Sequence, residues 1–199
     1  MIHEKSKFDQ SIISSWIIRG ATVLDLGCGD GELLSRLISE KQVSGQGIEL
    51  NERAIRRCVA SGLSVIQQDL DTGLAEYGDK SFDYVILNQT LQQVRKPDLA
   101  LKEALRVGGR VIVGFPNFCY IWDRFQIFFH GRVPVTPSLP YQWYDTPNLH
   151  FLSIADFLDY CSKRNLKILQ STFFRKNEKT NFLPNLLAEN GLFLITKAS

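Results

Sequence analysis

The sequence predicts an α/β fold of the Rossmann-like kind, in which helices flank a mostly parallel sheet. Two observations support this prediction. Short apolar runs alternate with helical segments from residue 21 to residue 115, and a glycine-rich turn at residues 27–31 follows the first apolar run. Continuous apolar strands that alternate with helices are typical of a parallel sheet covered on both faces. Because the chain has 199 residues, we expect a single domain over residues 1–199.

Hydrophobic periodicity then assigns each element in order. An apolar helical stripe opens the chain and ends near Gly20, and Pro97 stands at the first-turn position that helices favour. Residues 120–129 are expected to form at most a short helix, and residues 177–190 a loop or a weak helix. The seven expected strands cover residues 21–26, 45–50, 63–68, 82–87, 109–115, 166–174 and 192–197, and the main helices cover residues 31–40, 52–60, 97–106 and 154–164.

Composition excludes several classes of function. The net charge is only +2, which argues against electrostatic capture of nucleic acid or of an anionic membrane. The four cysteines lie far apart without a C-x-x-C pair, so neither a metal site nor a disulfide framework is expected, and a reducing compartment fits. The longest N-terminal apolar stretch is short and interrupted by polar residues. We therefore expect a cytoplasmic protein.

The glycine-rich turn is the main candidate binding site. Residues 25–31 read Asp-Leu-Gly-Cys-Gly-Asp-Gly, after an expected strand and before an expected helix. Glycines let the backbone turn tightly and approach a ligand closely. Glu49 ends the next expected strand about 20 residues further on, where a carboxylate can accept hydrogen bonds from both ribose hydroxyls. The pattern predicts a nucleoside site at the carboxyl ends of the strands.

The residue after the turn, Glu32, discriminates between nucleotide ligands. A dinucleotide fingerprint needs a third glycine at this position, and a carboxylate near a helix N-terminus repels a pyrophosphate. S-adenosylmethionine carries a sulfonium, an ammonium and a carboxylate but no phosphate, so it is compatible with the nearby acids Asp25 and Asp30. The sequence therefore favours S-adenosylmethionine or its demethylated product, S-adenosylhomocysteine. A nicotinamide or flavin dinucleotide, or no nucleotide, remain as alternatives.

Residues 25–31 and Glu49 resemble motif I and the second-strand acid of class I S-adenosylmethionine-dependent methyltransferases. The resemblance implies a hydrogen bond from the adenine amino group to Asp69, for which an ordinary loop cap is the alternative. Many small-molecule methyltransferases of this type carry a histidine where this chain has Gln93, which weakens any role in base-assisted methyl transfer. We expect the Cys28 side chain to be a packed residue and not a nucleophile. The implied ligand contacts are Asp25, Gly27, Cys28, Gly29, Gly31, Glu49, Leu50, Asp69, Leu70 (packed on the adenine) and Asn88 (beside the methionine moiety).

An aromatic, proline-containing stretch narrows the resemblance. Residues 115–118, 131–136 and 139–150 are similar to the signature of the MetW family of methionine biosynthesis proteins. Members of that family are associated with the homoserine O-acyltransferase of the MetX type, as partner or activator. The resemblance implies a protein of methionine biosynthesis that binds S-adenosylmethionine or S-adenosylhomocysteine and acts on that enzyme. An active small-molecule methyltransferase is the alternative.

The same stretch is expected to form an insert or lid at about residues 118–152, because loops of this length are usually functional. His150 is the one histidine suited to act as a general base, although it can instead serve only to position the loop. Ser153 and Asp156 are predicted to form a helix capping box. Four residues have the composition of a partner or substrate surface, with capping of the local core as the alternative: Arg132, Tyr141, Trp143 and Tyr144.

Overall fold

The computed structural model describes the backbone of residues 2–198 and the side chains of residues 8–198. An eight-stranded sheet with the strand order β3-β2-β1-β4-β5-β8-β6-β7 runs through the molecule. Strands β1 to β5 are parallel, whereas β8 is antiparallel to both β5 and β6. Chain order reverses between β1 and β4, which is where ligands bind in open α/β sheets. The strands are β1 (Thr22–Leu26), β2 (Ser44–Glu49), β3 (Ser64–Gln67), β4 (Phe82–Asn88), β5 (Gly108–Pro116), β6 (Leu166–Arg175), β7 (Glu178–Lys179) and β8 (Asn190–Lys197).

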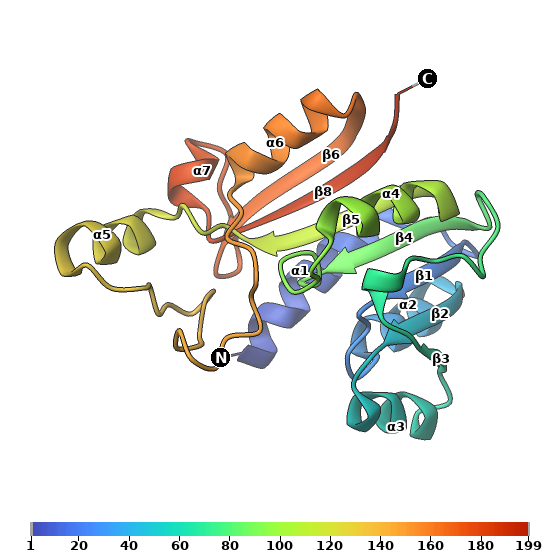
Figure 1. Ribbon diagram of the computed structural model, residues 1–199. Coiled ribbons are helices and arrows are strands. Elements are labelled where there is room, and N and C mark those ends of the chain that lie inside the picture. The colour runs from blue at the N-terminus through green and yellow to red at the C-terminus, as the bar shows by residue number, and fades with distance from the viewer. Residues whose placement is uncertain (1, 199) are drawn as a thin grey trace.

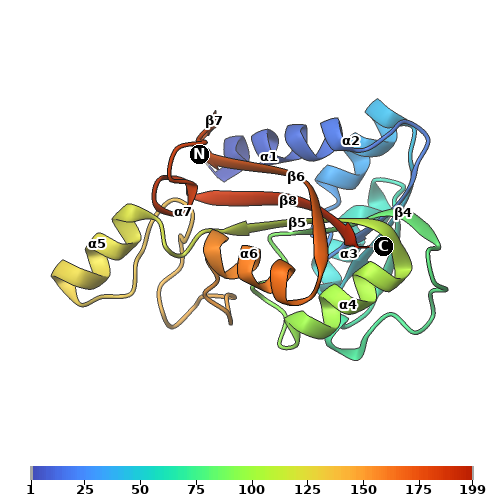
Figure 2. The same ribbon diagram turned by 90° about the horizontal axis from the view of Figure 1, so that it is seen from above.

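Helices cover both faces of this sheet (Figures 1 and 2). Alternate strand residues point to opposite faces, so Val23 packs with α1 and α2 while Leu24 packs with α4 and α6. Within residues 2–198, no helix combines the length and the apolar character needed to cross a membrane. The helices are α1 (Ile2–Trp16), α2 (Glu32–Lys41), α3 (Glu52–Ala60), the 3-10 helix η1 (Leu70–Thr72), α4 (Pro97–Val107), α5 (Ile121–His130), α6 (Ile154–Lys163) and α7 (Pro184–Leu187).

The expected Rossmann-like α/β architecture is confirmed, but the expected number of strands is wrong. Each of the seven predicted strands is present, with ends within two residues of the prediction. The eighth is β7, which pairs with the end of β6 in a hairpin inside residues 177–190, the segment expected to be a loop or a weak helix; the short helix α7 lies in the same segment. A strand of two residues has no periodicity to detect. The Ser153–Asp156 capping box at the start of α6 is confirmed.

Asn117 anchors the long connection between β5 and α6. Its side chain is fully buried, its Nδ2 donates to the Ala188 carbonyl at 2.8 Å, and its Oδ1 accepts from the Ile154 backbone N–H at 3.4 Å. Next to it, the Phe118 N–H donates to the Leu152 carbonyl at 3.2 Å. The two ends of the connection therefore meet at the carboxyl end of β5, and the residues between them form a loop that returns to its starting point.

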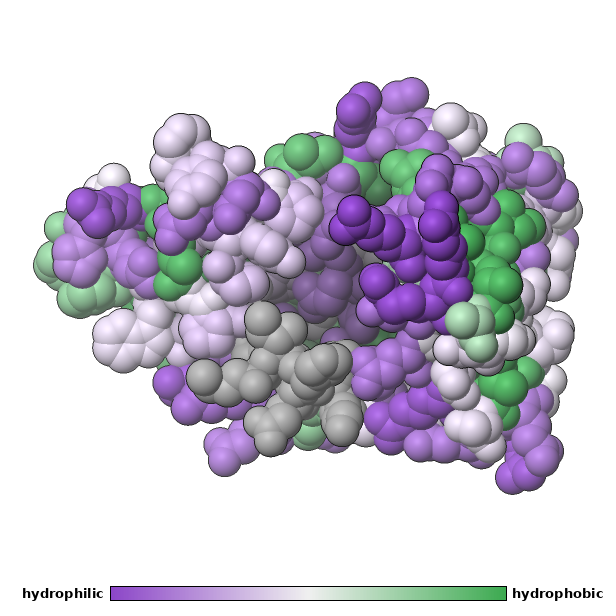
Figure 3. All heavy atoms as spheres, turned by 90° about the horizontal axis from the view of Figure 1, so that it is seen from below, coloured by the Kyte–Doolittle hydropathy of each residue, from purple (hydrophilic) through white to green (hydrophobic). Residues whose placement is uncertain are grey.

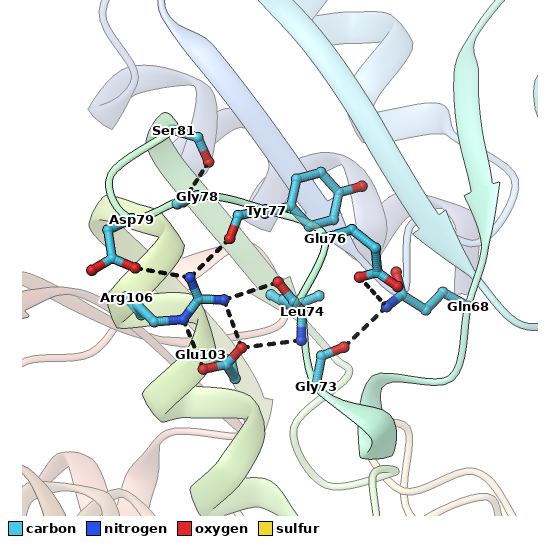
Figure 4. A network of polar contacts seen from close by, with 10 residues as sticks. All are labelled: Gln68, Gly73, Leu74, Glu76, Tyr77, Gly78, Asp79, Ser81, Glu103 and Arg106. Carbon is cyan, nitrogen blue, oxygen red and sulfur yellow. Dashed lines mark hydrogen bonds and ion pairs between the residues drawn. The ribbon is translucent and has the colours of Figure 1, made fainter.

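A network around Arg106 fixes the segment between η1 and β4 (Figure 4). The guanidinium donates to the Tyr77 carbonyl at 2.8 Å and to the Leu74 carbonyl at 2.9 Å. It also pairs with Glu103 at 2.7 Å and with Asp79 at 2.9 Å. One planar donor group thus joins α4 to a segment without regular structure, and this geometry is specific to arginine.

We predict that Arg106→Lys lowers the thermal unfolding temperature. An ammonium group cannot reproduce the forked contacts, so backbone carbonyls of residues 74 and 77 lose their donors. Arg95→Lys is the matched control, because the Arg95 side chain is exposed. Equal melting curves for the two variants would contradict the structural role of the network.

Candidate ligand site at the glycine-rich turn

The turn after β1 requires glycine at two positions in particular. Gly27 has a φ of 75°, and a Cβ atom there would lie 2.6 Å from Thr90 Oγ1. Gly31 has a φ of 77° as the N-cap of α2, and a Cβ atom there would overlap the Leu63 side chain. Positive φ and close approach both exclude larger residues. The turn is tied to β2 because the Gly27 N–H donates to the Ile48 carbonyl at 2.8 Å.

Glu49, at the end of β2, bridges the turn to the neighbouring loop. One carboxylate oxygen accepts the Gly29 N–H at 2.8 Å, and the other accepts the Leu50 and Asn51 N–H groups at 2.8 and 2.9 Å. A carboxylate offers about four lone-pair sites. Glu49 therefore holds two loops in register and keeps acceptor capacity for a ligand hydroxyl.

Two buried acids lie at the same end of the sheet. Burial, followed by the charge of Glu49, raises the pKa of Asp25 to about 7. Burial also raises the pKa of Asp9, on α1, to about 6, although a 3.1 Å hydrogen bond from Asn88 Nδ2 partly opposes this. Desolvation penalises the charged form of a carboxyl group. Both carboxyls are therefore poised to ionise fully when a cation is placed beside them.

These acids line a cavity of about 440 Å³, and Figure 3 looks onto a hollow in the surface with hydrophilic residues around it. Asn88 and Gln92 are among the lining residues, and each has a buried side-chain oxygen without a hydrogen-bond partner among the described residues. A ligand with hydrogen-bond donors and positive charge is the complement of such a wall. Among the residues with described side chains, the lining contains no lysine, arginine or histidine, but it contains four carboxylates: Asp9, Asp25, Asp30 and Glu32.

The connection between β5 and α6 forms one wall of the cavity. Tyr141 and residues 137, 138 and 140 contribute to the cavity lining. The segment is fastened to β4's end, because the Gln92 carbonyl accepts the Leu149 N–H at 2.8 Å and the His150 N–H at 3.1 Å. We call residues 132–150 the lid.

The predicted adenosine contacts lie on the neighbouring strand ends. Leu50, after β2, is 58% exposed and available for stacking. Asp69, after β3, caps η1 by accepting the Asp71 N–H at 2.9 Å, as the loop-cap alternative anticipated. Leu70 is buried in the main core, so little of its surface is available to a ligand.

The structure does not bring the two candidate reactive groups together at the cavity. The Cys28 side chain packs under the turn with Cys58 and Leu63, and burial raises the pKa of its thiol, which disfavours a nucleophilic thiolate. His150 lines a different cavity of about 350 Å³ between α4 and α6, which shares no lining residue with the first.

The predicted partner-surface residues are exposed on the lid. Trp143 is 73% exposed and its ring centroid lies 5.6 Å from that of Tyr144. Arg132 is exposed as well. Tyr141 lines the ligand cavity and also a small cavity of about 70 Å³ that Trp143 borders. One lid residue thus lies between the candidate ligand site and the candidate surface.

Sequence reasoning missed Asp9 as a residue of this site. A signal for Asp9 exists in the sequence, because Ile12 and Ile13 follow it at helical spacing and place it on the apolar face of α1. An acid on such a face indicates a buried functional group or a buried ion pair.

A family model described as methionine biosynthesis protein MetW matches residues 7–195. The chain is similar to a bifunctional methionine biosynthesis protein MetXA/MetW of Rhodopirellula baltica, with 36% identity over 186 residues. The match covers 89% of this chain but only 30% of that relative. This chain therefore corresponds to a minor part of the longer protein.

Solved structures show the same fold at low sequence identity. A methyltransferase of Thermotoga maritima, described as a possible histamine N-methyltransferase, matches with a TM-score of 0.69 and 20% identity, covering 99% of this chain and 91% of that one. Magnesium protoporphyrin IX methyltransferase of Synechocystis, with bound SAH, matches with a TM-score of 0.67 and 16% identity, covering 99% and 84%. The expected class I methyltransferase fold is confirmed.

We predict that the ligand-free protein loses stability as the pH rises from 5 to 8. The pKa of Asp25 is about 7 in the folded state, above its unfolded value, so the folded state holds the proton more tightly in this range. Stability therefore falls by about 2–3 kcal/mol for this group alone.

Urea unfolding of wild type and Asp25→Asn at pH 5, 6.5 and 8 measures this effect. The asparagine variant has no proton to lose, so its dependence on pH should be flatter and its advantage greatest at pH 8. Parallel dependences for the two proteins would contradict the assignment to Asp25.

Proposed function

The chain is a member of the MetW family of methionine biosynthesis proteins, and from this premise we propose that it binds S-adenosylmethionine or S-adenosylhomocysteine and acts as partner or activator of a homoserine O-acyltransferase of the MetX type. The observation that carries the ligand assignment is the cavity at the glycine-rich turn. Its lining includes four carboxylates and, among the residues with described side chains, no lysine, arginine or histidine.

The proposed pose follows from the chemistry of each wall. Glu49 accepts the ribose hydroxyls, and the adenine lies between Leu50 and Asp69. The methionine end then points toward Asp25 and Asn88, where ammonium and sulfonium meet carboxyl and amide oxygens. Because a sulfonium is charged and the thioether of S-adenosylhomocysteine is not, this wall favours S-adenosylmethionine of the two.

The partner assignment is supported by the relative from Rhodopirellula baltica, whose name joins MetXA and MetW in one protein. Fusion keeps two activities together at a high effective concentration. As separate chains, the same two units need a surface for association. The lid supplies exposed aromatic residues and an arginine, which are the residue types enriched at binding hot spots.

The two halves of the proposal are linked through the lid. A ligand in the cavity contacts Tyr141 on the cavity side of the lid, while the partner contacts the solvent-exposed side of the lid. If the ligand changes affinity for the acyltransferase, the acyltransferase changes affinity for the ligand by the same factor. S-adenosylmethionine is formed downstream of homoserine acylation, so this arrangement is suited to feedback on that step.

We predict that Glu49→Ala lowers affinity for S-adenosylmethionine at least about 100-fold, because it removes the ribose acceptor and releases the Gly29 N–H. Isothermal titration calorimetry measures the change, and thermal melting checks the fold. Glu52→Ala is the matched control, because Glu52 is exposed on α3 and pairs only at the surface with Arg56 at 3.6 Å. An equally tight Glu49→Ala variant would refute the ligand site.

We predict that adding this protein to a purified homoserine O-acyltransferase of the same organism forms a complex and raises acyltransferase rate, and that S-adenosylmethionine shifts the titration curve. Stopped assays of acyl transfer and gel filtration measure both. Neither complex nor rate change would overturn the partner assignment. A labelled methyl group that appears on a metabolite in the same mixture would instead support the methyltransferase alternative.

A further inference from the structure

Helix α5 projects from the body of the molecule and presents aromatic side chains to solvent (Figures 1 and 2). Phe128 is 81% exposed, Phe129 is 63% exposed and Trp122 is 52% exposed. Isolated exposed apolar residues need no explanation, but contiguous ones indicate an interaction site. In Figure 3, hydrophobic residues are visible at the tip of this protruding end, beside hydrophilic ones.

The exposed rings form one connected group on a fixed helix. The ring centroids of Phe125 and Phe129 are 4.4 Å apart, and those of Phe128 and Phe129 are 4.8 Å apart. Gln126 ties the helix to the lid, because its side chain accepts the Val135 N–H at 3.2 Å and donates to the Val135 carbonyl at 3.4 Å. A surface that is ordered before binding loses less entropy on association.

Further apolar side chains are exposed on the lid, which Gln126 ties to α5. Val133 follows α5 closely in the chain and is exposed, and it borders the same small cavity as Trp143. We define the α5 surface as the exposed side chains of Trp122, Phe128, Phe129, Val133 and Trp143.

Exposed charges near the α5 surface include the basic residues Arg124 and Arg132 and, two residues from Trp143, the acid Asp145. The one acid of the helix, Asp123, is fully buried, whereas Arg132 is exposed beside the helix end. Complementary charge steers association and selects partners. The arrangement fits a protein surface with an apolar cleft and an acidic rim. It offers fewer cations than the clusters of four to eight that bind anionic membranes.

We infer that the α5 surface is the docking site for the homoserine O-acyltransferase, an inference that rests on the proposed function. The relative that carries MetXA and MetW in one chain supplies the reason to choose this occupant over a second copy of the protein. The fusion requires the two units to be compatible neighbours. Among residues 8–198, the α5 surface is an exposed aromatic face, and the lid to which α5 is tied also lines the ligand cavity. Docking there buries Phe128 and Phe129 as central anchors, with Arg132 at the rim.

The test compares the double variant Phe128→Ser/Phe129→Ser with Val59→Ser. Val59 is also an exposed apolar residue, but it lies on α3, at the opposite end of the sheet from α5 (Figure 1). Biolayer interferometry with immobilised homoserine O-acyltransferase should show at least about a 30-fold higher Kd for the double variant, as expected when hot-spot side chains are removed. The control should stay within about twofold of wild type.

Calorimetry with S-adenosylmethionine and thermal melting establish that the double variant keeps its fold and its ligand site. If wild type and the double variant bind the acyltransferase equally, the α5 surface is not the docking site although the proposed function stands. If wild type does not bind at all, both the function and the inference fail. Two further measurements test other occupants of the α5 surface. A dimer that sedimentation detects for wild type but not for the double variant would overturn the inference in favour of a second copy. Flotation of wild type, but not of the double variant, with phosphatidylserine vesicles would overturn it in favour of a membrane.

Discussion

The carboxylate of Glu49 holds the candidate site together. Its two oxygens accept N–H groups from the turn after β1 and from the loop after β2, so two loops that share no secondary structure keep a fixed relation. Glycines make the turn possible, since residues 27 and 31 tolerate no side chain. Glu49 then selects one arrangement among the many that glycine allows. The cavity, the acids and the lid are all positioned relative to that turn.

The buried acids set the chemical character of the site at a cost in stability. Asp9 and Asp25 are desolvated and no cationic side chain lines their cavity among residues 8–198. Replacing these two acids by apolar or amide side chains of similar size would stabilise the fold relative to the buried carboxyls. Such uncompensated groups are typical of functional sites, where a ligand supplies the missing charge. The acids that line the cavity would repel a phosphate group, so a phosphate-bearing nucleotide fits this turn poorly.

Local signals in the sequence predicted much of the fold and part of the site. The bounds of α3 are as predicted because Asn51 caps its first turn. The glycine turn was recognisable because its backbone conformation restricts residue choice locally. Asp9 was missed because its importance arises only when α1 meets strand ends that lie far along the chain. The exposure of Phe128 could not be predicted either. An aromatic helix is usually part of the core, and only the fold shows whether another described element packs against it.

The lid is the element through which a ligand and a partner can influence each other. Tyr141 lines the ligand cavity and also the small cavity beside Trp143, and Gln126 joins the lid to α5. A ligand shifts an equilibrium only by its difference in affinity for the two states. Under the proposed function, a ligand that contacts Tyr141 in the cavity would supply such a difference if it binds one arrangement of the lid better than another. Coupling between ligand and partner therefore requires no change in the sheet, only a change in how firmly residues 132–150 are held.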